Sequence, residues 1–167
     1  MTDLPKFYPG AVISDRTRLE MNEDTFIGSM AFVSVPVLKM AKGSQINAGA
    51  KLVGRGTVSL GPYAVVSYDA LLLTSSDTPY GNMADAIPED MRCIVTGDIT
   101  IGAHAFVSAK TVICPGVSIG ERSFIGIGCV IKKDVGSGEH ITLKDGTLYY
   151  DQRRMKRPIW GCIYDKD

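Results

Sequence analysis

The stretch from Ile101 to Gly136 reads IGAHAF, VSAKTV, ICPGVS, IGERSF, IGIGCV, IKKDVG, six consecutive blocks of six residues. Every block opens with Ile or Val, and its fifth residue is small or β-branched. A period of six fits neither an α-helix nor an amphipathic heptad. It predicts an all-β solenoid whose coil is a triangle of three short strands, with the aliphatic residue inside and glycine at many of the turns.

A second array precedes this one and follows the same spacing more weakly, with a signal that extends back to about Met40. A shift of two residues divides it. Its members are Ile46, Leu52 and Val58 before the shift, and Leu60, Val66 and Leu72 after it. Because one coil cannot bury its inner face alone, the stability of such a fold must come from the stacking of neighbouring coils.

The composition agrees with this fold and limits the classes of binding partner to be expected. The 167 residues suit one domain, and 18 Gly with a single Trp are typical of β-structure with tight turns. Lys+Arg and Asp+Glu are both 18, so the net charge is zero and no nucleic-acid partner is indicated. The start, MTDLPKFYPG, has no basic region followed by an apolar run. We therefore expect no signal peptide, no membrane insertion and a cytoplasmic protein.

The four cysteines form no CxxC pair, so the sequence predicts reduced thiols and no zinc ribbon. No other metal site is expected. The chain contains two histidines, whereas a carbonic anhydrase built on a hexapeptide solenoid needs three as zinc ligands.

Residues 75–97, SSDTPYGNMADAIPEDMRCIVTG, interrupt the period between the two arrays. Long irregular insertions in compact folds are usually functional. We interpret this one as a loop extruded at the active site, with a surface excursion of no function as the alternative.

The repeat stops after Val135. Residues 141–150, ITLKDGTLYY, predict a β-hairpin that turns at Lys144-Asp145-Gly146. The sequence thus divides into a β-helix domain at 1–150 and a C-terminal cap or tail at 151–167.

The segment ITIGAHAFVSAKTVICPGVSIGERSFIGIGCVIKKDV, Ile99 to Val135, resembles the core of the sugar O-acetyltransferases in the hexapeptide-repeat acyltransferase superfamily. The resemblance covers about Gln45 to Val135. It implies a left-handed parallel β-helix, a homotrimer with active sites between adjacent prisms, and acetyl-CoA as the acyl donor.

Acyl transfer from a thioester needs a base for the acceptor, donors for the oxyanion, and alignment of both substrates. Histidine is the side chain best suited to act as the base near neutral pH. His104 is the fourth residue of its block, a position that faces outward, so we predict it to be the base, with a turn or surface histidine as the alternative. For His140, beyond the repeat, we expect a structural role.

In many O-acetyltransferases of this family the catalytic histidine stands where this chain has Asp77. The chain also resembles a subgroup linked with O-antigen and other surface-polysaccharide modification, through Ser75-Ser76-Asp77, then Gly81, Met83 and Ile87-Pro88, and then Ile101-Gly102-Ala103-His104. That resemblance implies that Asp77 and His104 form a carboxylate–imidazole pair across neighbouring edges or subunits. Alternatively, Asp77 holds an acceptor hydroxyl or opens the loop as an Asx-turn.

The resemblance also implies contacts to both substrates. The donor contacts fall on Ala109 and Ile127, through the backbone, and on Lys132 and Lys133. Lys133 matches the basic residue expected near the CoA phosphates, Lys132 stands where relatives have threonine, and solubility is the alternative role for both. The acceptor contacts fall on Asn47 and, in the loop, on Tyr80, Asn82 and Met83. Arg55 stands where relatives have an acidic residue, so the acceptor stays open.

The leading hypothesis is an acetyl-CoA-dependent acetyltransferase that acts on a sugar hydroxyl, in the biosynthesis or modification of a surface polysaccharide. The acceptor is then a saccharide or a nucleotide sugar. Two alternatives remain. One is N-acetylation of an amino sugar, which can be nucleotide-linked, and the other is a β-helix that scaffolds or only binds a ligand.

Overall fold

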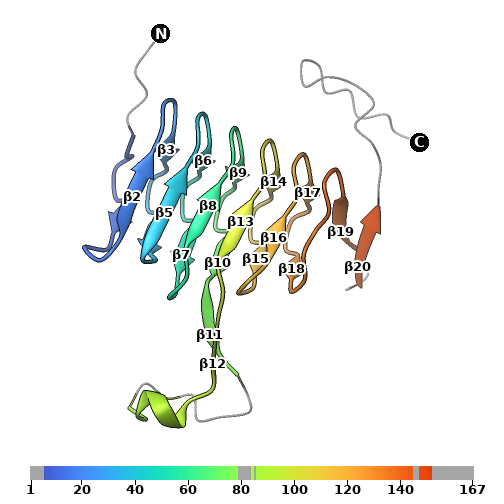
Figure 1. Cartoon of the computed structure of the whole chain (residues 1–167). Coiled ribbons are helices and arrows are strands. Elements are labelled where there is room, and N and C mark those ends of the chain that lie inside the picture. The colour runs from blue at the N-terminus through green and yellow to red at the C-terminus, as the bar shows by residue number, and fades with distance from the viewer. Residues whose placement is uncertain (1–5, 79–83, 85, 145–146, 152–167) are drawn as a thin grey trace.

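A computed structural model describes residues 6–78, 84, 86–144 and 147–151. They form a β-solenoid of about six coils, with a single short 3-10 helix. In each coil the chain runs through three parallel sheets, which we name face 1, face 2 and face 3. Figure 1 shows the coils side by side along one axis, with the N-terminal coil at one end and the last strands at the other.

The three faces are built from short strands. Face 1 contains β1 (Val12–Ile13), β4 (Phe32–Ser34), β7 (Lys51–Val53), β10 (Leu71–Leu73), β15 (Val112–Ile113) and β18 (Val130–Ile131). Face 2 contains β2 (Arg18–Met21), β5 (Val37–Met40), β8 (Val58–Leu60), β13 (Ile99–Ile101) and β16 (Ser118–Ile119). Face 3 contains β3 (Phe26–Ile27), β6 (Gln45–Ile46), β9 (Val65–Val66), β14 (Phe106–Val107), β17 (Phe124–Ile125), β19 (His140–Lys144) and β20 (Thr147–Asp151).

The core is built mainly from the aliphatic residues that open the hexapeptide blocks, as the sequence predicts, together with the small residues at the fifth positions. Parallel register stacks them coil on coil, so that Leu52, Leu72 and Ile113 lie one above the other on face 1. Each such residue removes its apolar surface from water only because the next coil covers it. The block-opening residues from the C-terminal array are all buried: Ile101, Val107, Ile113, Ile119, Ile125 and Ile131.

The solenoid begins at β1, well before the point near Met40 where the sequence signal fades. Longer strands on face 2 hide the period in these coils. In β5 both Leu38 and Met40 point inward, and in β8 both Val58 and Leu60 do. The shift of two residues in the second array is therefore an extra inward position within one strand rather than a break between coils.

The insertion at 75–97 projects from the edge between faces 1 and 2 (Figure 1). We name it the arm. Its base is regular, contrary to the irregular loop expected from the sequence: β11 (Ser75–Asp77) pairs antiparallel with β12 (Ile94–Thr96). A chain that leaves and re-enters a solenoid at one corner must run antiparallel to itself, so a two-stranded ladder satisfies its backbone groups. The 3-10 helix, η1 (Glu89–Met91), lies farther out along the arm.

The predicted C-terminal hairpin is present. β19 pairs in parallel with β17 and antiparallel with β20, so the hairpin extends face 3 at the end of the solenoid. His140, expected ahead of the hairpin, is the first residue of β19. The predicted cap or tail, apart from Asp151, lies outside the described residues.

Candidate active site

The predicted site residues divide among the three edges of the solenoid. The 1–2 edge, between β10 and β13 and between β18 and the bridge at Val135, carries the arm with Asp77, and also Lys132 and Lys133. The 2–3 edge carries His104. The 3–1 edge carries Asn47, Ala109 and Ile127. The other three predicted acceptor contacts, Tyr80, Asn82 and Met83, lie outside the described residues.

His104 lies at the turn between β13 and β14, partly exposed, with a positive φ of 57°. This conformation belongs to the corner rather than to the histidine. The residues at the same corner of the other coils also have positive φ: Asp24, Gly43, Tyr63, Arg122 and Gly138. Histidine is among the residues that tolerate this region better than most, so the corner accepts it.

The imidazole of His104 stacks on the phenol ring of Tyr63, one coil earlier. The ring centroids are 5.2 Å apart and the planes are inclined by 14°. The backbone N–H of His104 donates to the carbonyl of Pro62 at 2.8 Å, which joins the two turns. His140 is placed differently, because its Nε2 is buried without a hydrogen-bond partner among the described residues and its ring packs on Phe124.

Asp77 is held by Arg92 from the opposite strand of the arm. Nε of Arg92 donates to Oδ1 at 2.9 Å, and Nη2 donates to Oδ2 at 2.7 Å. The Asp77 side chain is 25% exposed and the Arg92 side chain is 10% exposed. The hydrogen bonds from Arg92 lower the pKa of the Asp77 carboxyl, with further help from the charges of Arg92 and Arg55 and against the opposing effect of burial. A carboxylate held in this way can orient a partner, but it is a poor proton acceptor.

The arm also makes an ion pair with the body of the solenoid. Arg55 lies on the 1–2 edge one coil before the arm, and its guanidinium contacts the carboxylate of Glu89 in η1. At the base of the arm, the Thr74 hydroxyl accepts from the Gly56 N–H at 3.0 Å and lies 3.2 Å from the Val53 carbonyl, to which it donates. These contacts attach both ends of the arm to the same edge.

Asp77 and His104 do not meet within one chain, because they lie on different edges. A pair between them requires a second copy. The structure brings together Ala109 and Ile127, which occupy successive turns of the 3–1 edge, and the N–H of Gly128 donates to the carbonyl of Ala109 at 3.1 Å. Ile127 is 69% exposed, so this edge presents apolar surface to the outside.

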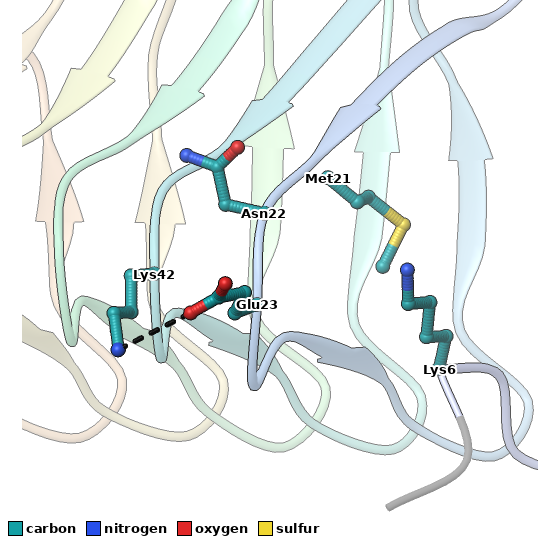
Figure 2. A pocket seen from close by; sticks show the side chains of 5 residues that line it. All are labelled: Lys6, Met21, Asn22, Glu23 and Lys42. Atoms are coloured by element: carbon teal, nitrogen blue, oxygen red, sulfur yellow. Dashed lines mark hydrogen bonds and ion pairs between the residues drawn. The ribbon is translucent and has the colours of Figure 1, made fainter. Parts of the chain in front are cut away.

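Figure 2 shows a shallow open pocket at the N-terminal end of the 2–3 edge, lined by Lys6, Met21, Asn22, Glu23 and Lys42. Glu23 accepts a hydrogen bond from Lys42 at 3.3 Å, and this bond raises the pKa of the Lys42 ammonium group. The pocket contains none of the predicted site residues. It therefore does not identify the active site.

Within the described part of the chain, no group of three or more His, Cys, Asp or Glu side chains is arranged to bind a metal ion. The same residues contain no helix with the length and apolar character that crossing a membrane requires.

Comparison with known proteins finds two curated enzymes with partial sequence similarity to this chain. No family model matches the chain. Curated relatives do match: a dTDP-4-amino-4,6-dideoxy-D-glucose acyltransferase of Escherichia coli, 27% identical over 50% of the chain, and the galactoside O-acetyltransferase of Escherichia coli K12, 28% identical over 65%. Both relatives are acyltransferases by name. The chain spans about half the length of these relatives, 44% of the first and 55% of the second.

Solved structures support the same fold. AntD, an N-acyltransferase from Bacillus cereus, crystallised with dTDP-4-amino-4,6-dideoxyglucose and coenzyme A, superposes with a TM-score of 0.73 at 18% identity, over 87% of this chain and 81% of AntD. A hexapeptide-repeat acetyltransferase from Vibrio cholerae gives 0.54 at 15% identity, over 86% of this chain and 71% of that protein. At sequence identities of 18% and 15%, these structures show a shared fold and nothing more.

Two residues of the site were missed by the sequence analysis. Arg92 is the only basic residue among those at 75–97, which contain four acidic ones, so an ion pair was predictable but its partner was not. Tyr63 precedes His104 by 41 residues in the sequence, and the two rings meet only because successive coils place their corners side by side. An alignment of the corner residues of successive coils predicts that Tyr63 and His104 are neighbours.

Proposed function

We propose that this chain is an acetyl-CoA-dependent acyltransferase that moves the acetyl group to a sugar hydroxyl, with His104 as the base. The observation that carries the proposal is the partly exposed imidazole of His104 on an open edge, in a solenoid whose relatives transfer acyl groups. The other histidine, His140, has its Nε2 buried and is unsuited to the role.

We further propose a homotrimer, supported by the unequal chemistry of the three faces. The outward residues of face 2 are mostly polar, with Val37 as an exception, whereas those of faces 1 and 3 are largely apolar. Apolar faces gain most from contact with another copy. The outward polar residues of face 2 are Arg18, Glu20, Lys39, Ser59, Thr100 and Ser118; the outward apolar residues of the other faces include Val12, Phe32, Leu71, Val112 and Val130 on face 1 and Phe26, Val65, Phe106 and Phe124 on face 3.

A ring that buries faces 1 and 3 directs the 3–1 edge toward its axis. Each groove between neighbours then combines the 2–3 edge of one copy with the 1–2 edge of the next, because contacts in a ring are heterologous. This arrangement brings His104 of one copy toward the arm of its neighbour. Asp77 is then the group that orients the imidazole, and Lys132 and Lys133 at the same edge suit the phosphates of CoA.

In the reaction, Nε2 or Nδ1 of His104 takes the proton of the acceptor hydroxyl as its oxygen attacks the thioester carbon. The negative charge that develops on the carbonyl oxygen is held by a backbone N–H. Collapse of this intermediate breaks the C–S bond, and the imidazolium returns the proton to the departing CoA sulfur. The Asp77 carboxylate stays ionised throughout, as its lowered pKa favours.

Transfer to an amino sugar is a second candidate, and the position of the donor contacts favours it. Ala109, Ile127 and Asn47 share the 3–1 edge, which cannot line the same groove as His104 and the arm of a neighbour in one ring. If that edge instead faces the neighbour's arm, the site holds Asp77 and Arg92 but lacks His104. An amine in its neutral form can attack a thioester without a strong base, so this groove suits N-acylation.

Activity measured on a panel of acceptors distinguishes O-acetylation, N-acetylation and a non-catalytic scaffold. Wild type and His104→Asn are given acetyl-CoA with methyl galactoside or with dTDP-4-amino-4,6-dideoxyglucose, and CoA release is measured. If the enzyme is an O-acetyltransferase, wild type turns over the hydroxyl acceptor and His104→Asn does so about 100-fold more slowly. Calorimetry should show that the variant still binds acetyl-CoA. Turnover only with the amine, unaffected in His104→Asn, supports the second candidate. No binding of acetyl-CoA at millimolar concentration supports a scaffold.

The proposal assumes a reducing, cytoplasmic setting. Cys93, Cys114 and Cys129, in the described part of the chain, are not joined by disulfides.

A further inference from the structure

We infer that Tyr63 is a positioning residue for His104: its ring fixes the plane of the imidazole from which the proton transfer is made. The inference rests on the proposed role of His104 as base, and it adds a residue that does not itself contact the reacting atoms.

The first support is the geometry of the ring pair. Tyr63 and His104 occupy the same corner of successive coils, with φ values of 56° and 57°, so their side chains leave the edge in the same direction. Their rings stack at 5.2 Å with only 14° between the planes. Such pairs add to stability beyond the area they bury.

The second support is the far side of the Tyr63 ring, which rests on Gly43. A Cβ at Gly43 would lie 2.5 Å from both Cδ1 and Cε1 of Tyr63, so no other residue fits there without moving the ring. Gly43 has a φ of 68° and occupies the same corner one coil earlier. The ring is therefore held between the backbone of Gly43 and the imidazole of His104.

This arrangement restricts His104 in a way that suits a base. Stacking covers one face of the imidazole and leaves its edge, where both nitrogen atoms lie, turned away from the contact. A catalytic group whose rotamer is fixed before the substrate arrives loses less entropy in the transition state. The phenol hydroxyl takes no part in the stack, so phenylalanine should serve as well as tyrosine.

The first test observes the imidazole directly and needs no substrate. The chain has two histidines, so carbon–proton correlation spectra give two sets of ring signals, which His104→Asn assigns. Tyr63→Asn removes the ring with a residue that tolerates positive φ. We expect the ring-current shift of His104 to be lost in Tyr63→Asn and retained in Tyr63→Phe. Unchanged His104 signals in Tyr63→Asn would overturn the inference.

The second test separates positioning from general damage. With acetyl-CoA and the acceptor that supports turnover, Tyr63→Asn should lower kcat roughly threefold to tenfold and leave the KM for acetyl-CoA unchanged, while Tyr63→Phe matches wild type. Phe7→Leu is the control, since Phe7 is 46% exposed against 48% for Tyr63 and lies at the N-terminal end.

The outcomes distinguish the two proposals. Full kcat in Tyr63→Asn, with His104→Asn inactive, would overturn the positioning role alone. Full turnover in His104→Asn would overturn the proposed base and the positioning role with it. A loss in Tyr63→Asn that Tyr63→Phe does not restore would also contradict the inference, because it would assign the effect to the hydroxyl.

Discussion

The two edges that flank face 2 both turn the chain from one sheet to the next, but they hold their candidate site residues in different ways. On the 2–3 edge, every coil turns through one residue with positive φ, and His104 is one member of that row. On the 1–2 edge, one coil opens into an arm of two antiparallel strands, whose Asp77 is fixed by Arg92. The first edge holds the His104 imidazole through its stack on Tyr63, and the second holds the Asp77 carboxylate through its ion pair with Arg92. A site built from both gains a fixed imidazole and a fixed carboxylate.

The largest expected effect separates His104 from its neighbours in the row. His104→Asn should lower kcat about 100-fold and lower the melting temperature only slightly, because asparagine keeps the turn but can neither act as a base nor stack on Tyr63. Arg122→Asn, at the same corner one coil later, should leave kcat near wild type. Equal losses in the two variants would show that the edge matters as a surface rather than through one imidazole.

Gly43→Ala tests how tightly the 2–3 edge is packed. The new Cβ adds strain at positive φ and clashes with the Tyr63 ring, and we expect a loss of about 2 kcal/mol in the free energy of unfolding. Gly138→Ala is matched, since Gly138 has a φ of 73° at the same corner with nothing within 4 Å of a Cβ. It should cost about 1 kcal/mol, from strain alone.

A double variant assigns the difference. Tyr63→Asn should recover the part of the Gly43→Ala loss that comes from the clash, measured by urea denaturation of all four proteins. No recovery would mean that the Tyr63 ring moves aside freely and does not hold the edge.

On the 1–2 edge, Arg92→Met should free the Asp77 carboxylate and loosen the arm. We expect kcat to fall roughly tenfold, as positioning losses of this kind do, and amide exchange to accelerate at 75–77 and 94–96. The Arg55–Glu89 pair is more exposed, so Arg55→Met should change both quantities less. The reverse order would place the main attachment of the arm at its outer contact.

The smallest effect is on the pH dependence of stability. Arg92 lowers the pKa of Asp77 in the folded protein, so the pair contributes stability above the unfolded carboxyl range, about pH 4, and loses it as the pH falls through the lowered value. The melting temperature of wild type should exceed that of Asp77→Asn by a constant margin between pH 5 and 7. The margin should disappear toward pH 2. A margin that grows in acid would contradict the assignment.

The sequence predicts the repeated parts of the molecule better than the parts that combine coils. The blocks that open with residues from Ile101 to Ile131 are enough to predict the fold, because the first residue of each block is buried in the core. The coils before Met40 escape notice because face 2 strands such as β5 place two residues inward and break the period. The hairpin is predictable from its turn, but the strands of the arm are not, since β11 and β12 are three residues each.

The candidate site divides in the same way. That His104 faces outward follows from its place in the block, whereas its contact with Tyr63 depends on how successive coils stack. The family resemblance predicts His104 as the partner of Asp77, whereas within one chain the partner is Arg92, because opposite strands of the arm bring these side chains together. Whether His104 of one copy meets Asp77 of another depends on assembly, which no local pattern encodes.

The most direct test of the central claim, that neighbouring copies complete one site, is a subunit-mixing experiment. His104→Asn and Asp77→Asn, each with low turnover alone, are co-expressed with different tags and the mixed oligomer is purified. If each groove takes His104 from one copy and Asp77 from the next, one of the three grooves in every mixed trimer contains both intact residues, about one third of the total. We therefore expect the purified mixed trimer to recover to about one third of wild-type kcat. A mixed oligomer no more active than the average of the two variants would contradict it.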